Sequence, residues 1–454
     1  MQLFNQNFLN MKVLKFGGTS VGSADRMRQV AKLINNNQPK IVVLSAVSGT
    51  TNQLVEMSSM LYKSDVARFN QLLLIMEDQY TDFIEKLITN QELRSEAFSV
   101  LTLHMNHIDA FSKDMFTKFE ERAILAQGEL LSTAIFALYC KQEGINANLF
   151  PALDFMRINN EGEPDDYYIK VNLERMLKEF EGTDILITQG FICRNAYGEI
   201  DNLKRGGSDY TASLIGAAID AEEIQIWTDI DGMHNNDPRV VQNTQPIRQL
   251  SFDEAAELAY FGAKILHPSS VRPAKEKNIV VRLKSTLDPT AEGTIISTAS
   301  NRNFIKAVAA KDGITAIKIK SGRMLLAYGF LRSVFEVFEL YKTSIDMITT
   351  SEVAISLTID DTSNLDEIIK DLEKFGIVEV DRDQSIVCVV GDFLAERAGF
   401  ANEIMHALKE IPLRMVSYGG SRNNVSVLVN SDHKKKALNA LNDYLLHQTG
   451  EGME

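Results

Sequence analysis

Two apolar strands with a short helix between them open the chain, and this pattern restricts the possible fold more than any other feature. Residues 12–16 read as a strand that ends in two glycines, and residues 24–34 carry apolar side chains at helical spacing. Residues 41–44 (IVVL) are then apolar without a break, as in a strand that is covered on both faces. Such strands lie in parallel sheets between layers of helices. We therefore expect an α/β fold with a mainly parallel central sheet flanked by helices.

The sheet pattern is interrupted once and then resumes. Between residues 53 and 139 the only glycine is Gly128 and there is no proline, while apolar residues recur at helical periods. This stretch predicts a helical insertion. Apolar strands return at residues 184–188, 224–228 and 279–283.

The last third of the chain contains an internal repeat. Gly329-Phe330 recurs 70 residues later as Gly399-Phe400, and at the same offset Ser351 matches Ser421. Each copy reads as a glycine-led turn, an amphipathic helix and two strands. We expect two small α+β modules after the larger α/β domain.

The composition argues against several classes of protein. The 47 Lys and Arg residues are outnumbered by 61 Asp and Glu, a net charge of −14, which argues against sequence-independent binding to nucleic acid. No apolar run reaches the roughly 18 residues of a membrane span, and residues 1–10 lack the basic start of a secretory signal, so they read as a short extension ahead of Met11. The three cysteines are far apart, which fits a reducing, cytoplasmic compartment. We expect no nucleic-acid and no membrane partner.

The first candidate site is the segment from Lys15 to Gly22 (KFGGTSVG). Gly17 and Gly18 let the backbone approach a phosphate closely, the helix N-terminus that follows favours an anion, and Lys15 adds a positive charge. The segment matches neither the Walker P-loop nor the G-x-G-x-x-G pattern. A tight strand-to-helix turn is an equally good interpretation of this segment taken alone.

Two further candidates are weaker when each is taken alone. Ser45, Ser48 and Thr51 follow the strand at 41–44, where ligands of open α/β sheets bind. Glu129 lies in an otherwise apolar helical stretch, and a buried carboxylate needs a cationic partner such as a substrate ammonium. A serine-rich turn and a structural ion pair explain the same residues.

The strongest candidate on chemistry alone is Arg205-Gly-Gly-Ser208-Asp209. It offers a guanidinium for a carboxylate, backbone N–H groups, a helix N-terminus and an acid that can orient Mg²⁺ or a phosphoryl group. Ser208 or Asp209 can also cap the helix expected at residues 210–218, and both roles can hold together.

The polar loop at residues 227–239 follows a buried strand, as ligand-binding loops often do, and Lys264 and His267 can add to it; a plain surface loop is the alternative. His104 and His107 share one helical face without a third ligand. Because His-Glu-x-x-His and Gly-x-Ser-x-Gly patterns are also absent from the sequence, we expect no resident metal site and no hydrolase.

Taken together and in this order, these segments closely resemble the aspartate kinases (aspartokinases) of the amino acid kinase family. The resemblance runs from residue 11 nearly to the C-terminus. It rests on residues 15–21 (KFGGTSV), 203–212 (LKRGGSDYTA), 227–229 (WTD) with 237–240 (DPRV), and 261–268 (FGAKILHP). The ordered set is much more specific than any one of these motifs.

The resemblance implies the amino acid kinase fold for residues 11–298, followed by two ferredoxin-like ACT modules. In this family the first module is inserted into the second, so residues 316–384 are expected to form the first, and residues 303–315 plus 385–449 the second. ACT pairs in this family bind an end-product amino acid and mediate dimer contacts. A homodimer or a dimer of dimers is therefore expected.

The implied reaction transfers the γ-phosphoryl group of ATP, with Mg²⁺, to the β-carboxylate of L-aspartate, giving 4-phospho-L-aspartate and ADP. It is the first step of the pathway to lysine, threonine and methionine. By resemblance, Lys15 and Asp209 are catalytic, Gly17, Gly18 and Thr19 bind phosphate, Ser45, Thr51, Glu129, Arg205 and Ser208 bind aspartate, and Thr228, Asp229, His234, Arg239 and Lys264 bind the nucleotide.

The lysine-sensitive class of the family is the most similar, and its lysine-binding positions suggest the effector site. The matching residues are Met324, Gly329, Phe330, Leu331, Ser344, Asp346, Thr350 and Ser351. Leu326 and Ala327 replace a histidine and a serine, which removes hydrogen bonds of about 1 kcal/mol each. In the nucleotide loop, His234 stands where relatives carry tyrosine, and Asn235 and Asn236 replace small hydroxyl residues.

Two other functions compete with aspartate phosphorylation. One is an ACT-based amino-acid sensor with a degenerate kinase domain, against which the presence of Lys15, Glu129, Arg205 and Asp209 counts. The other is a kinase for glutamate or a nucleotide, which the ACT pair and the Glu129/Arg205 clamp disfavour. A panel of substrates distinguishes all three.

Overall fold

The computed structural model describes most of the chain. The described residues are 11–36, 38–203, 206–262, 266–299, 305–322, 328–392, 396 and 398–446. Arg205, Lys264, Met324, Leu326 and Ala327 lie outside them, as does the extension at 1–10. The chain divides into two compact units. The first is Met1–Met233, Arg248–Phe252 and Ile265–Ala299, and the second is His234–Ile247, Asp253–Lys264 and Ser300–Glu454.

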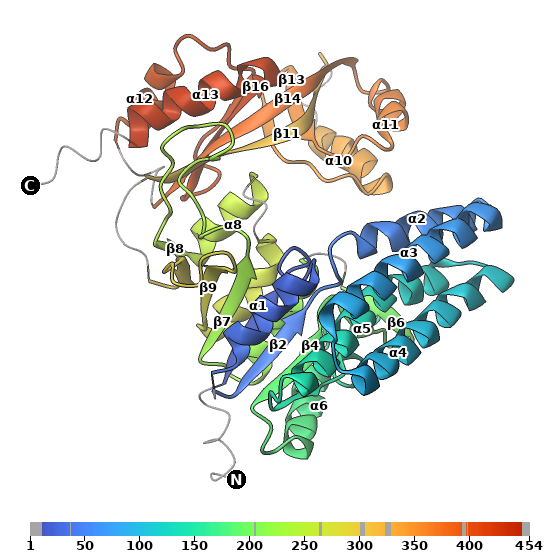
Figure 1. The fold of residues 1–454 in the computed structure, drawn as a ribbon. Helices are drawn as coiled ribbons and strands as arrows, with labels where there is room; N and C mark the ends of the chain where they lie inside the picture. The colour runs from blue at the N-terminus through green and yellow to red at the C-terminus, as the bar shows by residue number, and fades with distance from the viewer. Residues whose placement is uncertain are drawn as a thin grey trace, which may run out of the picture. The chain divides into compact units, whose positions relative to one another are not determined.

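The first unit is built on one eight-stranded sheet (Figure 1). Its strands are β1 (Lys12–Phe16), β2 (Lys40–Leu44), β3 (Ala147–Leu149), β4 (Ile185–Gln189), β7 (Glu223–Thr228), β8 (Gln249–Ser251), β9 (Val280–Ser285) and β10 (Thr294–Ser297). In the order β3-β4-β2-β1-β7-β9-β10-β8, every neighbouring pair is parallel except β9 with β10. The expected fold, a mainly parallel sheet, is confirmed.

The helices of this unit are α1 (Ala24–Ile34), α2 (Thr50–Tyr62), α3 (Val66–Leu87), α4 (Gln91–Ala110), α5 (Lys118–Gln142), α6 (Asp166–Glu179), α7 (Gly207–Ala218) and α9 (Arg272–Lys277). Helix α8 (Phe252–Tyr260) follows β8. A short hairpin, β5 (Ile192–Arg194) with β6 (Ile200–Asn202), precedes α7.

Both faces of the sheet are buried, as the continuous apolar runs predict. In β1, Leu14 and Phe16 join a core that includes residues of α1 to α5. Val13 and Lys15 alternate with them and therefore face the other side, where Val13 is fully buried and α7 packs over β1, β2 and β7. This alternation directs Lys15 towards the layer that contains α7.

Four helices form the predicted insertion between β2 and β3. Helices α2, α3, α4 and α5 lie side by side (Figure 1), with α2 and α5 also in contact. Of all helices in the described ranges, α5 alone has the length and hydropathy of a membrane span, a mean of 1.5 over its most apolar window. That window is 72% buried inside the protein and carries Glu129, which is the behaviour of a core helix.

The second unit is built on a six-stranded antiparallel sheet in the order β12-β13-β11-β14-β16-β15. Its strands are β11 (Ile305–Lys320), β12 (Ile348–Thr350), β13 (Ala354–Ile359), β14 (Ile377–Gly391), β15 (Met415–Ser417) and β16 (Asn424–Asn430). Its helices, besides α8, are α10 (Phe330–Leu340), α11 (Leu365–Leu372), α12 (Phe400–Ala407) and α13 (Lys434–Leu441). Gly329 and Gly399 both adopt a φ of 82° at the start of α10 and α12, so the repeated glycines occupy equivalent left-handed positions.

Two long strands are shared between the two copies of the repeat. Residues 314–320 of β11 pair with β13 and with the first half of β14, whereas residues 305–311 pair with the second half of β14, beside β16. We call the β12–β13 side, with α10 and α11, the first module, and the β15–β16 side, with α12 and α13, the second module. This pairing is the one expected if residues 303–315 complete the second module; the module boundaries stay a prediction.

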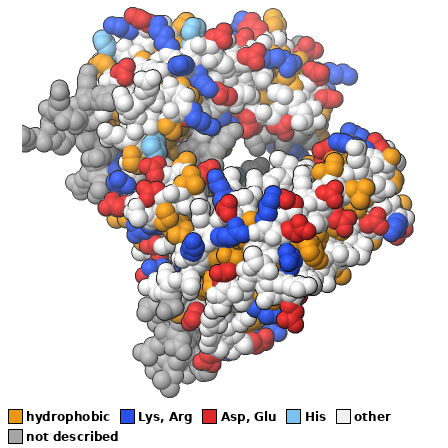
Figure 2. Space-filling model, in the orientation of Figure 1, with side chains coloured by type: hydrophobic (Ala, Val, Ile, Leu, Met, Phe, Trp, Pro, Cys, Tyr) orange, Lys and Arg blue, Asp and Glu red, His pale blue; other side chains and the backbone are white. Residues whose placement is uncertain are grey.

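The surface carries charges of both signs. On the face drawn in Figure 2, Lys and Arg side chains are interspersed with Asp and Glu side chains over the described residues.

Candidate active site

The candidate residues of the first unit collect at one edge of its sheet. Strands β1, β2, β4, β7 and β9 are parallel neighbours in close register, with Phe16 opposite both Leu44 and Trp227. Their carboxyl ends therefore meet at the same edge, where open α/β sheets bind ligands. The loops that begin at Gly17 and Ser45 leave from this edge.

An ion pair joins the end of β1 to the start of α7. The Nζ atom of Lys15 lies 2.6 Å from Oδ1 of Asp209, and each side chain is only 13% exposed. The same ammonium would lie 3.3 Å from a Cβ atom added to Gly17, so it sits against the backbone of the glycine loop. Asp209 thus holds a cation at the place where the sequence predicts a phosphate.

The glycine loop also packs against the loop that follows β2. A Cβ atom on Gly18 would lie 3.0 Å from the carbonyl oxygen of Ala46, and one on Gly22 would lie 2.9 Å from Cβ of Ser48. Part of the reason for these glycines is therefore the close approach of two backbones. The structure therefore supports the tight-turn interpretation, whereas phosphate binding by this segment stays a prediction.

Glu129 is a buried carboxylate with one oxygen left open. It is 4% exposed, and its Oε1 accepts a hydrogen bond of 3.2 Å from the backbone N–H of Ala46. Oε2 has no hydrogen-bond partner among the described residues. Burial raises the pKa of Glu129 to about 7, against a smaller opposing effect of the Ala46 bond. The open oxygen has the chemistry needed to take a cation.

Gly128 makes this approach possible. A Cβ atom there would lie 2.8 Å from Cβ of Ala46 and 3.3 Å from Cγ2 of Thr50, so only glycine lets α5 come this close to the loop after β2. Thr50 in turn shares a buried hydrogen bond of 2.9 Å with the hydroxyl of Tyr80. The predicted Thr51 is half-buried in the first turn of α2, while its neighbour Thr50 is the buried hydroxyl.

Ser45, which follows β2, and Ser208, in the first turn of α7, meet beside a glycine that the sequence analysis missed. The hydroxyl of Ser45 donates to Oγ of Ser208 at 2.9 Å. A Cβ atom on Gly190 would lie 2.3 Å from both Cβ and Oγ of Ser208, so Gly190 reserves the space for this side chain. The available signal was a glycine two residues after the apolar strand at 184–188.

The other predicted residues of the first unit lie in or just after the strands and loops described above, but their side chains have fewer hydrogen-bond partners. Thr19 is exposed in the glycine loop, and Asp229 is exposed after β7. Thr228 donates to Oδ1 of Asp229 at 3.1 Å, and its carbonyl oxygen accepts bonds of 2.7 and 2.9 Å from the N–H and hydroxyl of Thr286. In the described part of the chain, His, Cys, Asp and Glu side chains form no group of three that could hold a metal ion.

His234 and Arg239 belong to the second unit, unlike Thr228 and Asp229. Arg239 is exposed and forms a two-bond ion pair with Asp237, with both N–O distances 2.9 Å. Its hydrogen bonds hold the pKa of Asp237 below the usual range. Nδ1 of His234 lies 3.0 Å from the hydroxyl of Thr244.

The two asparagines that depart from the family pattern have structural partners. Asn236 is 3% exposed, and its amide lies 3.4 Å from the carbonyl oxygen of Leu438 and 3.3 Å from Oδ1 of Asn442. The amide oxygen of Asn235 accepts a hydrogen bond of 2.9 Å from the backbone of Gln245. Both side chains fasten the loop within its own unit.

The predicted effector residues that the structure describes lie in the first module. Gly329, Phe330 and Leu331 form the start of α10, where Leu331 is 39% exposed. Ser344 is exposed before β12, Thr350 is exposed at its end, and the N–H of Ser351 donates to the carbonyl oxygen of Ala354 at 2.8 Å. The side chain of Asp346, in contrast, is 1% exposed.

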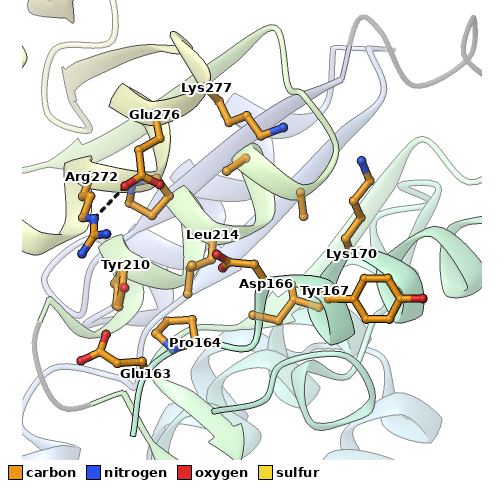
Figure 3. A pocket seen from close by; sticks show the side chains of 14 residues that line it. Glu163, Pro164, Asp166, Tyr167, Lys170, Tyr210, Leu214, Arg272, Glu276 and Lys277 are labelled. Atoms are coloured by element: carbon orange, nitrogen blue, oxygen red, sulfur yellow. Dashed lines mark hydrogen bonds and ion pairs between the residues drawn. The ribbon is translucent and has the colours of Figure 1, made fainter. Parts of the chain in front are cut away.

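A separate pocket of about 560 Å³ lies along the outer side of α7 (Figure 3). It is lined by Glu163, Pro164, Asp166, Tyr167, Ile169, Lys170, Tyr210, Leu214, Ala217, Ala218, Arg272, Pro273, Glu276 and Lys277. Arg272 donates to Glu276 at 2.8 Å, and burial together with Glu276 raises the pKa of Asp166. None of the predicted site residues lines this pocket.

Comparisons with known proteins agree with this arrangement. Residues 10–285 match the amino acid kinase family, and residues 387–445 match an ACT domain. The chain is 34% identical to the chloroplastic aspartokinase 3 of Arabidopsis thaliana, covering 94% of this chain and 80% of that protein. The chain belongs to the aspartokinase family. It is also 32% identical to the lysine-sensitive aspartokinase 3 of Escherichia coli (strain K12), covering 95% and 98% of the two chains.

Solved aspartokinase structures have the same fold. Aspartokinase III of E. coli in complex with aspartate and ADP (R-state) matches with a TM-score of 0.82 and 31% identity, over 96% of this chain and all of that chain. The same enzyme in complex with lysine and aspartate (T-state) matches with a TM-score of 0.78, over 96% and 99%. The resemblance to aspartokinases inferred from the motifs is therefore confirmed.

The Gly190→Ala substitution tests how Ser208 is placed. Because the added methyl group collides with Ser208, we expect the protein to lose about 1–3 kcal/mol of stability. Gly322→Ala is the matched control, since a Cβ atom there meets nothing within 4 Å. Thermal unfolding of both variants measures the difference, and equal melting temperatures would show that Ser208 is not confined by Gly190.

Proposed function

We propose that this chain transfers the γ-phosphoryl group of ATP, with Mg²⁺, to the β-carboxylate of L-aspartate, yielding 4-phospho-L-aspartate and ADP. One observation carries this proposal: an ammonium held against a glycine loop and a buried, half-open carboxylate stand at the same edge of the sheet. The first suits a phosphate and the second suits an amino acid. The curated relatives named above are aspartokinases.

Aspartate is held by the charges of its α-ammonium and α-carboxylate groups. Oε2 of Glu129 takes the α-ammonium, and Ser208, together with Arg205 from outside the described residues, takes the α-carboxylate. Ser45 supports Ser208 through their hydrogen bond, and Thr51 adds a hydroxyl. An analogue that lacks either charge leaves a buried group unpaired, which is how such a site selects an amino acid.

Transfer requires two anions to approach each other, so neutralising their repulsion is the main task of the protein. An oxygen of the aspartate β-carboxylate attacks the γ-phosphorus, the bond from that phosphorus to the bridging oxygen breaks, and ADP leaves with the electron pair. Lys15 and the backbone N–H groups of Gly17, Gly18 and Thr19 stabilise the charge on the phosphoryl oxygens. Asp209 keeps the Lys15 ammonium in place. Mg²⁺ supplies further charge neutralisation when it enters with ATP.

The remaining assignments extend the same proposal. Thr228, Asp229, His234, Arg239 and Lys264 hold the nucleotide. The enzyme acts in the cytoplasm and forms a homodimer or a dimer of dimers through its ACT modules. Lysine, the effector named for the E. coli relative, is the effector we propose, bound at Met324, Gly329, Phe330, Leu331, Ser344, Asp346, Thr350 and Ser351.

Trapping of the acyl phosphate with hydroxylamine tests the reaction. With Mg·ATP we expect aspartate hydroxamate from L-aspartate and none from L-glutamate, because the clamp fixes the length of the acceptor. Hydroxamate from glutamate would point to another amino acid kinase. Folded, ATP-binding protein that forms no hydroxamate would favour the ACT-based sensor instead.

Replacing the cation at the glycine loop should stop the reaction. Lys15→Ala removes the charge that offsets the phosphoryl oxygens, so we expect kcat to fall at least about 100-fold while circular dichroism shows an intact fold. Lys12→Ala is the control, because Lys12 begins the same strand and makes only a surface ion pair of 3.4 Å with Glu222. Near-normal kcat in Lys15→Ala would remove Lys15 from catalysis.

The pH dependence of aspartate binding should follow Glu129. Its pKa is raised to about 7 in the free protein, so the carboxylate that binds the ammonium is mostly protonated at pH 6 and mostly ionised at pH 8. We therefore expect the KM for aspartate to fall about tenfold between these values. In Glu129→Gln the KM should be high and should lose this dependence; a wild-type profile as flat as that of the variant would contradict the assignment.

A further inference from the structure

Helix α8 belongs to the stretch that matches the amino acid kinase family, yet residues 253–262 lie in the compact unit of the ACT modules. Along the chain they lead directly to Lys264, which we assign to the nucleotide-binding site. Three separate contacts within this unit fix the end of α8.

The first contact is a buried carboxylate shared by two donors. The hydroxyl of Tyr260 donates to Oδ1 of Asp346 at 2.6 Å, and Nζ of Lys311 lies 2.8 Å from the same oxygen. The Lys311 ammonium also lies 2.9 Å from Asp360 and 4.5 Å from the centre of the Tyr260 ring. Burial lowers the pKa of Lys311, but its bonds to Asp346 and Asp360 outweigh this and raise the pKa overall.

The second contact reaches the other module. The Glu257 carboxylate accepts bonds of 2.8 Å from the hydroxyl of Ser421 and 2.5 Å from the amide of Asn424. Glu257 and Tyr260 are three positions apart, so they share one face of α8. Ser421 is the residue that repeats Ser351 of the predicted effector site. One helix face is therefore held by both modules.

The third contact is between backbones. Gly262 has a φ of 129°, and a Cβ atom there would lie 2.0 Å from the carbonyl oxygen of Ala310. The chain that leaves α8 thus touches β11 directly beside Lys311. This is also where the β11–β14 register shifts between its two halves.

The Oδ1 atom of Asp346 is therefore already bound by groups of the protein itself, whereas Oδ2 has no hydrogen-bond partner among the described residues. We propose that Tyr260 and Lys311 are internal ligands of Asp346, and that an ammonium-bearing effector bound to this carboxylate competes with the Tyr260 hydroxyl for its charge, which loosens the end of α8 ahead of Lys264. This inference rests on the proposed effector site. A ligand shifts such an equilibrium only through its different affinity for the two states, and here the difference is the competition for one carboxylate.

The competition predicts two results for Tyr260→Phe, which keeps the ring and removes the hydroxyl. Hydrogen–deuterium exchange of residues 252–262 should become faster than in the wild type. L-lysine, the probe, should bind about tenfold more tightly by calorimetry, because it no longer competes with a hydrogen bond to the charged carboxylate. Lysine added to the wild type should speed the hydrogen–deuterium exchange of the same amides.

Tyr341→Phe is the matched control, since that hydroxyl bonds Asp371 at 2.9 Å within the first module. It should change neither the exchange of residues 252–262 nor the lysine affinity. Unchanged exchange in Tyr260→Phe would show that the hydrogen bond from Tyr260 to Asp346 does not fix the end of α8. Lysine that binds with equal affinity to both proteins, or that fails to bind, overturns the competition. The hydroxamate assay reports failure of the proposed reaction independently of either result.

Discussion

The ion pair between Lys15 and Asp209 is the contact on which the candidate active site depends. It links the carboxyl end of a central strand to the first turn of α7, so it fixes both relative to the glycine loop. Because Lys15 alternates with Leu14 and Phe16, whose side chains enter the core on the other face, the strand itself determines which way the ammonium points. A cation held in this way loses little conformational freedom when a phosphate arrives, which is the basis of preorganised catalysis.

Close approaches at glycine residues bring the remaining groups to this pair. A Cβ atom on Gly18 or Gly128 would press against Ala46 in the loop after β2, and one on Gly190 would collide with Ser208 in α7. Together they place the loop after β2 against the glycine loop and α5, and make room for Ser208. The same loop delivers the Ala46 N–H to Glu129, which leaves the second oxygen of that buried carboxylate open. In the proposed function, selectivity for an amino acid and catalysis of phosphoryl transfer thus depend on the same backbone contacts.

The fold was predictable from sequence because β2 is apolar without a break, as in a strand covered on both faces, and because glycine or hydroxyl-bearing residues follow β1 and β2. Lys15, Glu129, Ser208 and Asp209 could also be found, since a lysine beside glycines and a carboxylate in an apolar helix are unusual locally. Gly190 could be noticed only as a glycine after an apolar strand, because its role is defined by the Ser208 side chain, which comes from the first turn of α7. Pairwise contacts of this kind leave no pattern within a single segment.

Long-range contacts also explain what sequence reasoning left open in the second unit. Asn235 and Asn236, read as departures in the nucleotide loop, are fastened by partners within their own unit. Tyr260 and Lys311 belong to no sequence motif. They meet at Asp346 because the chain that leaves α8 packs against β11 at Gly262.

A crystal structure of the protein with L-aspartate and ADP tests the central claim most directly. The account predicts the substrate ammonium within hydrogen-bond distance of Oε2 of Glu129, with the β-carboxylate facing the Lys15 ammonium. An aspartate whose ammonium binds elsewhere, with that oxygen still unpaired, would contradict it.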